Sequence, residues 1–116
     1  MLITRGDDGR KKITIGKGES ARTIYAEDIY YIESNDHKIS ISLADESIEC
    51  YGRIGDLEKE LKPDFFRIHK GYLVNVNYID HYNRTDAYMK NGDMISISKY
   101  KYSDFVQAYT KYFSKL

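Results

Sequence analysis

The segment Phe65–Asn75 combines aromatic, basic and titratable side chains. Apolar residues alternate with Arg67 and His69, and Lys70 follows directly. An alternation of this kind is typical of a strand with one face for a core and one face for a charged partner.

A second cationic segment, Ser96–Tyr102, interleaves Lys99 and Lys101 with hydroxyl and aromatic side chains just before a stretch of helical spacing. The amino terminus of a helix attracts anions, so helix electrostatics do not explain lysines there. Phosphate binding at this point would explain both. Cations left uncovered among aromatics and hydroxyls favour a polyanion over a small neutral ligand.

The formal net charge is zero, yet the charge is unevenly distributed along the chain. Residues 1–18 carry five basic and two acidic side chains, giving +3. Residues 19–64 carry five and twelve, giving −7, and residues 65–116 carry eight and four, giving +4. A neutral domain polarised in this way can present a basic face and keep its acidic face in solvent.

Residues that could catalyse a reaction or bind a metal are sparse. The histidines His37, His69 and His81 have no paired spacing, and Cys50 is the only cysteine. Metal sites use ligands at recurring short spacings, and no nucleophile or phosphate-loop motif is present either. We therefore expect a protein that is not an enzyme and that needs no metal or cofactor.

Length and composition favour a single domain, because 116 residues suffice for one hydrophobic core. No run of about 18 apolar residues predicts a membrane span, and the N-terminus lacks the apolar centre of a signal peptide. One cysteine fits a reducing, cytoplasmic compartment. Residues 1–10 are polar and contain glycine, which predicts a flexible N-terminal segment before a domain over 11–116.

Short alternating segments predict a mostly β fold. The clearest is Lys38–Leu43, which places three apolar side chains on one face and follows a polar turn at Ser34–His37. Asn91-Gly92 is the strongest hairpin signal. The other predicted strands cover 12–15, 23–25, 29–33, 48–51, 78–82, 87–90 and 94–97.

Two segments have helical spacing. Ile54, Leu57 and Leu61 lie on one face of a short helix that Pro63 stops. A C-terminal helix is predicted from about Ser103 to Ser114. Its apolar stripe consists of Phe105, Val106, Tyr109, Tyr112 and Phe113.

Four pieces of the chain resemble, in order and spacing, the LytTR-type DNA-binding domain, the output domain of many bacterial response regulators. These pieces are Asp28–Ser34, Gly52–Leu61, Phe66–Asn75, and Asn91-Gly92 followed by Ile95–Lys99. The resemblance covers roughly residues 11–113.

The resemblance implies an elongated, multi-stranded β fold with one short internal helix and a C-terminal helix. It implies transcription regulation through duplex DNA, with inter-strand loops entering the major groove at direct-repeat promoter sites and a homodimer forming on the DNA. The residues expected to bind DNA are His37, Lys38, Arg67, His69, Lys70, Lys99 and Lys101. Of these, Lys38 and Lys101 are added on charge alone, while Arg67 and His69 either contact DNA or orient their loop.

Two positions depart from the pattern of this family. Gly71 stands where Ser is usual, which removes a hydroxyl donor, and Lys99 stands where Arg is common. Lys donates as a point charge, whereas Arg offers guanine a planar fork. The receiver domain that usually accompanies such domains is not contained in these 116 residues.

Two other interpretations stay open. Interleaved Tyr and Lys also fit a single-strand or RNA binder with an aromatic platform. Alternatively, the basic face docks an acidic protein partner, and that binding would not depend on base sequence. Duplex and single-strand affinities measured side by side separate the first alternative from duplex binding.

Overall fold

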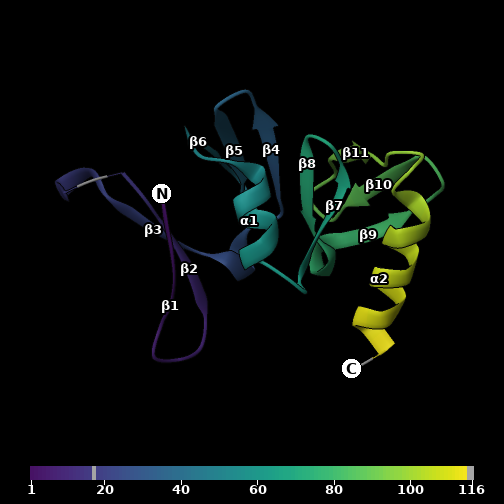
Figure 1. Ribbon diagram of the computed structural model, residues 1–116, viewed down its shortest axis with the longest axis horizontal. Helices are drawn as coiled ribbons and strands as arrows, with labels where there is room; N and C mark the ends of the chain where they lie inside the picture. The colour runs from purple at the N-terminus through teal and green to yellow at the C-terminus, as the bar shows by residue number, and fades with distance from the viewer. Residues whose placement is uncertain (17, 115–116) are drawn as a thin grey trace.

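Three β-sheets follow one another along an elongated molecule (Figure 1). The computed structural model describes residues 1–16 and 18–114 and measures 44 × 31 × 24 Å along its principal axes. The mostly β fold expected from the sequence is confirmed. Helix α1 (Ile54–Glu60) comes near the middle of the sequence, and helix α2 (Tyr102–Ser114) ends the described part of the chain.

The N-terminal sheet has the order β1-β2-β3. Its strands are β1 (Leu2–Arg5), β2 (Lys11–Ile15) and β3 (Arg22–Tyr25). Strand β1 lies within residues 1–10, the segment expected to be flexible, and it pairs with β2 from Leu2↔Thr14 to Arg5↔Lys11. The boundary placed between residues 10 and 11 falls inside this hairpin. Two adjacent apolar residues in β1 are too short a pattern to reveal alternation.

The central sheet is antiparallel and has the order β6-β5-β4-β8-β7. Its strands are β4 (Tyr31–Asn35), β5 (Lys38–Ser42), β6 (Ser47–Tyr51), β7 (Phe65–His69) and β8 (Tyr72–Asn75). The predicted alternation in β5 is confirmed, since Ile39 and Ile41 are fully buried. Strand β8 joins the β7–β8 hairpin to the meander of β4, β5 and β6 by pairing with β4.

The C-terminal sheet has the order β11-β10-β9. Its strands are β9 (Ile79–Tyr82), β10 (Asp86–Met89) and β11 (Met94–Ser96). The hairpin predicted at Asn91-Gly92 joins β10 to β11, and Gly92 has a φ of +95°, which suits a residue without Cβ. Short 3₁₀ turns connect other elements at Gly18–Ser20, Ala26–Asp28 and Val76–Tyr78.

Two hydrophobic cores lie on either side of the central sheet. The first joins that sheet to the N-terminal sheet and α1, and the second joins it to the C-terminal sheet and α2. Strand β7 serves both, because Phe65 is buried in the first core while Phe66 and Ile68 pack in the second. Successive side chains of a strand point to opposite faces, which accounts for this division, and a register irregularity between Phe66 and His69 lies further along β7.

Candidate nucleic-acid interface

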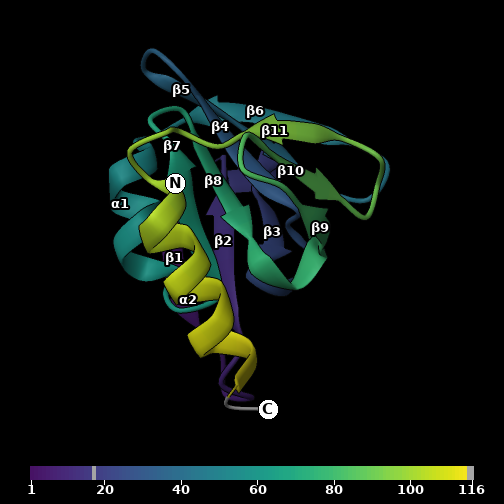
Figure 2. The same ribbon diagram turned by 90° about the vertical axis from the view of Figure 1, so that its right-hand side faces the viewer.

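Three connections that are distant in sequence meet at one end of the central sheet. They are the β4–β5 turn, the β7–β8 turn and the segment from β11 to α2, drawn at the upper end of the molecule in Figure 2. Backbone hydrogen bonds hold them together: Ser34 N donates to Gly71 O at 2.8 Å, and Ser98 N donates to Ile68 O at 2.7 Å. We call this end of the sheet the loop edge. It carries the exposed side chains of His37, Lys70, Lys99 and Lys101.

The β4–β5 turn presents His37. Asn35 pairs with Lys38 across the turn, and Asp36 between them has a φ of +58°, a conformation that Asp tolerates better than most residues. The His37 side chain is exposed and makes no hydrogen bond to the described residues. Two-residue turns are tight, so the pairing of β4 with β5 fixes the backbone that presents this imidazole.

Lys38, by contrast, is directed to its own sheet. Its Nζ lies 3.2 Å from Glu49 Oε1 and 5.4 Å from the ring centroid of Tyr51. The Glu49 carboxylate raises the pKa of Lys38. The cation therefore already has a partner on the neighbouring strand, and a DNA contact would compete with it.

Arg67 and His69 both brace the β7–β8 turn that presents Lys70. Arg67 donates from Nε at 3.1 Å and from Nη2 at 2.7 Å to the Lys70 carbonyl, while its Nη1 lies 3.2 Å from Glu58 of α1. His69 Nδ1 accepts a hydrogen bond from Gly71 N at 3.1 Å. The turn is thereby held at its carbonyl and at its amide, and Lys70 at its tip has no side-chain partner among the described residues.

Tyr72 continues this bracing into β8. Its hydroxyl donates to Glu33 Oε1 at 3.0 Å, and its ring packs edge-on against the His69 ring at a centroid distance of 5.8 Å. Burial and the Glu33 carboxylate raise the pKa of Tyr72, so the hydroxyl stays a donor. The side of the turn that faces the sheet is therefore occupied by internal contacts.

The segment from β11 to α2 presents Lys99, Tyr100 and Lys101. Lys101 N donates to Ser98 O at 2.9 Å, and Phe105 N donates to Lys101 O at 2.8 Å, which fixes the start of α2. Tyr100 is 86% exposed and lies between the two lysines. Neither lysine forms an ion pair within residues 1–16 and 18–114.

Arg53 also lies at the loop edge, and the sequence patterns did not single it out. It directly precedes α1, and Gly52 N donates to His37 O at 3.2 Å, so the start of α1 is tied to the β4–β5 turn. The signal that could have found it is a basic residue at the beginning of a predicted helix, the same signal that selected Lys101.

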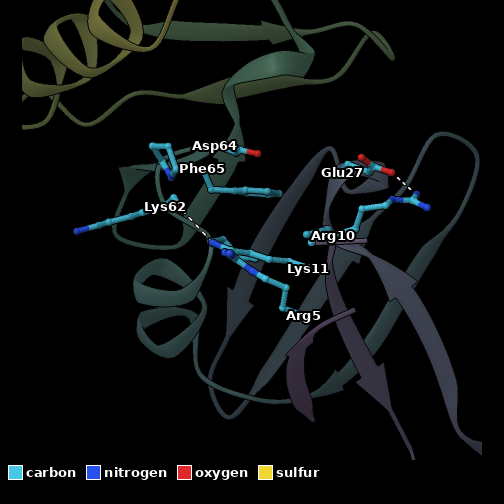
Figure 3. Close-up of a pocket in the computed structure, with 11 residues that line it drawn as sticks. Arg5, Arg10, Lys11, Glu27, Lys62, Asp64 and Phe65 are labelled. Carbon is cyan, nitrogen blue, oxygen red and sulfur yellow. Dashed lines mark hydrogen bonds and ion pairs between the residues drawn. The ribbon is translucent and has the colours of Figure 1, made fainter. Parts of the chain in front are cut away.

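A hollow lies at the end of β7 opposite the loop edge, between the β1–β2 hairpin and the end of α1 (Figure 3). Its volume is about 320 Å³. Lys11 Nζ donates to the carbonyls of Glu60 and Lys62, and Arg10 pairs with Glu27 and stacks on Tyr25. These cations serve to join the N-terminal sheet to its neighbours, so this hollow is not the candidate interface.

No cluster of three or more His, Cys, Asp or Glu side chains within 1–16 and 18–114 is arranged to hold a metal ion. None of the helices in that part of the chain is long and apolar enough to cross a membrane.

A family model described as the LytTr DNA-binding domain matches residues 19–110. The sensory transduction protein LytT of Bacillus subtilis (strain 168) is 30% identical over 97 residues, which span 78% of this chain and 40% of that protein. The transcriptional regulatory protein NatR of the same strain is 26% identical over 86 residues, 73% of this chain and 36% of that protein. The chain thus spans two fifths or less of these relatives.

A solved structure has the same fold. It is a LytTr DNA-binding domain of a putative methyl-accepting/DNA response regulator from Bacillus cereus, with a TM-score of 0.70 and 21% identity. The match covers 85% of this chain and 95% of that one.

Proposed function

This chain belongs to the LytTr DNA-binding domain family, and from that premise we propose that it binds double-stranded DNA sequence-specifically as the output module of a transcription regulator. The observation that carries the proposal is the loop edge. Three separate connections bring His37, Lys70 and Lys99 to one end of a rigid sheet, and none of these side chains has an internal partner in the described structure. Loops positioned by a rigid scaffold commonly carry binding residues.

In the proposed complex the three loops enter the major groove. His37, Lys70 and Lys99 reach base edges, where imidazole and ammonium groups can donate to purine acceptors. Lys101, beside the start of α2, contacts a phosphate and sets the register. Lys38, Arg67 and His69 act mainly by shaping the loops, as the contacts of Lys38 with Glu49 and of Arg67 with Lys70 O indicate. We further propose direct-repeat promoter sites, a homodimer on the DNA, and action in the bacterial cytoplasm.

Selection of duplexes from a randomised pool tests the proposal. The 116-residue chain is incubated with the pool, bound duplexes are amplified over several rounds, and the enriched sequence is compared with a scrambled duplex and with its own single strands. We expect a consensus, and tighter binding to the selected duplex than to either control. Enrichment without a consensus would refute sequence-specific binding, and preference for the single strand would favour the aromatic-platform alternative.

Duplex binding should depend strongly on salt. If about five Lys and Arg side chains at the interface come close enough to the DNA to neutralise phosphate charge, whichever group they contact, log K should fall against log salt with a slope near −4 to −5, because each neutralised phosphate releases condensed counterions. Titrations between about 50 and 200 mM salt measure the slope. A flat dependence would contradict the electrostatic part of the proposal.

Arg67→Ala should weaken DNA binding indirectly, through Lys70. The substitution removes both donors to the Lys70 carbonyl and leaves Glu58 unpaired, so the β7–β8 turn is no longer held in one geometry. If Arg67 acts only through the turn, Arg67→Ala should cost little more in the Lys70→Ala background, and the coupling should be about 0.5–3 kcal/mol. Affinities of the wild type, both single variants and the double variant give this value. Additive losses would instead mean that Arg67 contacts DNA itself.

A further inference from the structure

An arginine stands at the position that normally caps a helix. Arg53 is the N-cap residue of α1, with extended backbone (φ −119°, ψ 127°), and its side chain accepts no hydrogen bond from the helix. Ser, Thr, Asp and Asn are preferred at such positions because their side-chain oxygens accept from the first free amides. A cation there is also unfavourable next to the positive end of the helix dipole. Helix stability therefore does not account for Arg53.

The Arg53 side chain is exposed and has no acidic partner within ion-pair distance among the described residues. It lines an open hollow of about 550 Å³ that separates the β4–β5 turn from the start of α1. His37 lines the same hollow, as does Tyr51, which is 73% exposed. Asp36 is the only acidic residue among the described residues that line it, and it does not pair with Arg53. The guanidinium is thus free to bind an external anion.

The location of the hollow relates this anion to the loop edge. The hydrogen bond from Gly52 N to His37 O joins the residue before Arg53 to the turn that presents His37. An anion held by Arg53 would therefore lie beside whatever His37 contacts. The planar fork of a guanidinium matches the oxygens of a phosphodiester, and phosphate contacts typically fix the register of a protein whose other residues read bases.

We propose that Arg53 binds a phosphate of the DNA backbone next to the base pairs contacted by His37, and so extends the interface beyond the three loops to the start of α1. This inference rests on the proposed duplex binding. It assigns Arg53 a role in affinity and register and no role in base discrimination.

The variant Arg53→Ser separates DNA binding from folding, because it removes the cation and introduces a favourable cap. We expect its thermal midpoint to equal or exceed that of the wild type. Its affinity should fall about tenfold, and equally, for the selected and the scrambled duplex. The salt slope should become shallower by about 0.9, the amount expected for one lost phosphate contact. Arg53→Lys, which keeps the charge, should retain most of the slope.

Lys59→Ala is the matched control, because Lys59 is an exposed cation of the same helix that lies against β1. It should leave the affinity and the slope within error of the wild type. Unchanged affinity and slope in Arg53→Ser would overturn the inference, and so would a loss confined to the selected duplex or a loss matched by Lys59→Ala. If the wild type itself fails to bind duplex DNA, the proposed function has failed, and this result is distinct from a wild type that binds while Arg53→Ser binds equally well.

Discussion

Lys70→Ala should weaken binding to the selected duplex by about 1–3 kcal/mol, the range for loss of a good base contact. The ammonium lies at the tip of a turn that Arg67 and His69 hold at its carbonyl and amide, so the wild-type protein has already ordered the backbone that presents it. Binding then does not have to order the backbone of the turn, and removal of the donor is therefore expected to have a large effect. Affinity for the scrambled duplex should change less, because that complex depends mainly on phosphates.

His37→Ala should behave in the same way, and Lys101→Ala provides the contrast. We assign Lys101 to a phosphate, so its removal should weaken binding to both duplexes about equally. All three side chains are exposed, and exposed substitutions seldom change the free energy of unfolding by more than about 0.5 kcal/mol. Mobility-shift titrations against both duplexes, with thermal melts as a folding control, measure these effects.

The outcome that would contradict direct base contacts is an equal loss on both duplexes for all three variants. The loop edge would then be an electrostatic surface without sequence discrimination. Loss of thermal stability in any variant would mean that its affinity reports folding and not contact.

The elements that the sequence predicted best are those whose periodicity matches a buried face. The alternating apolar residues of β5 and the apolar stripe of α2 each face a hydrophobic core, so the residues that the pattern selects are the ones that are buried or partly buried. Strand β1 was missed because its pairing with β2 depends on register between two short segments and not on any local pattern. In β7 simple alternation places Phe65 in one core and Phe66 and Ile68 in the other, but the sequence could not show that both faces of this strand are covered, because that depends on the neighbouring sheets and helices.

The candidate site likewise has residues that the sequence indicated and contacts that it could not show. Resemblance to a family indicated His37, Lys70 and Lys99, because convergence of three distant connections is a property of topology that no single segment encodes. The sequence could not show that Lys38 pairs with Glu49 or that Arg67 binds the carbonyl of Lys70, since both contacts depend on neighbouring elements. Arg53 was overlooked because an isolated arginine before a short helix carries no periodic signal.

The largest effect on stability is expected from Phe105→Ala. Phe105 is fully buried in the second core. Its ring meets those of Tyr82, Phe66 and Tyr109 at centroid distances of 4.9, 5.7 and 5.8 Å. Removing the ring loses its transfer free energy and leaves a cavity that three rigid rings cannot readily fill, so the free energy of unfolding should fall by about 3–5 kcal/mol.

A loss of that size is a large share of the roughly 5–15 kcal/mol that stabilises a typical domain. It should also disturb the loop edge, because Phe105 N donates to the carbonyl of Lys101 and the ring anchors the first turn of α2. Urea unfolding followed by circular dichroism measures the change. Phe105→Leu should lose less, since it keeps most of the buried volume, and Tyr100→Ala, at an 86% exposed position five residues earlier, should lose about 0.5 kcal/mol or less. A loss below about 1 kcal/mol for Phe105→Ala would contradict the tight packing of α2 on β7 and β9 from which the position of Lys99 and Lys101 follows.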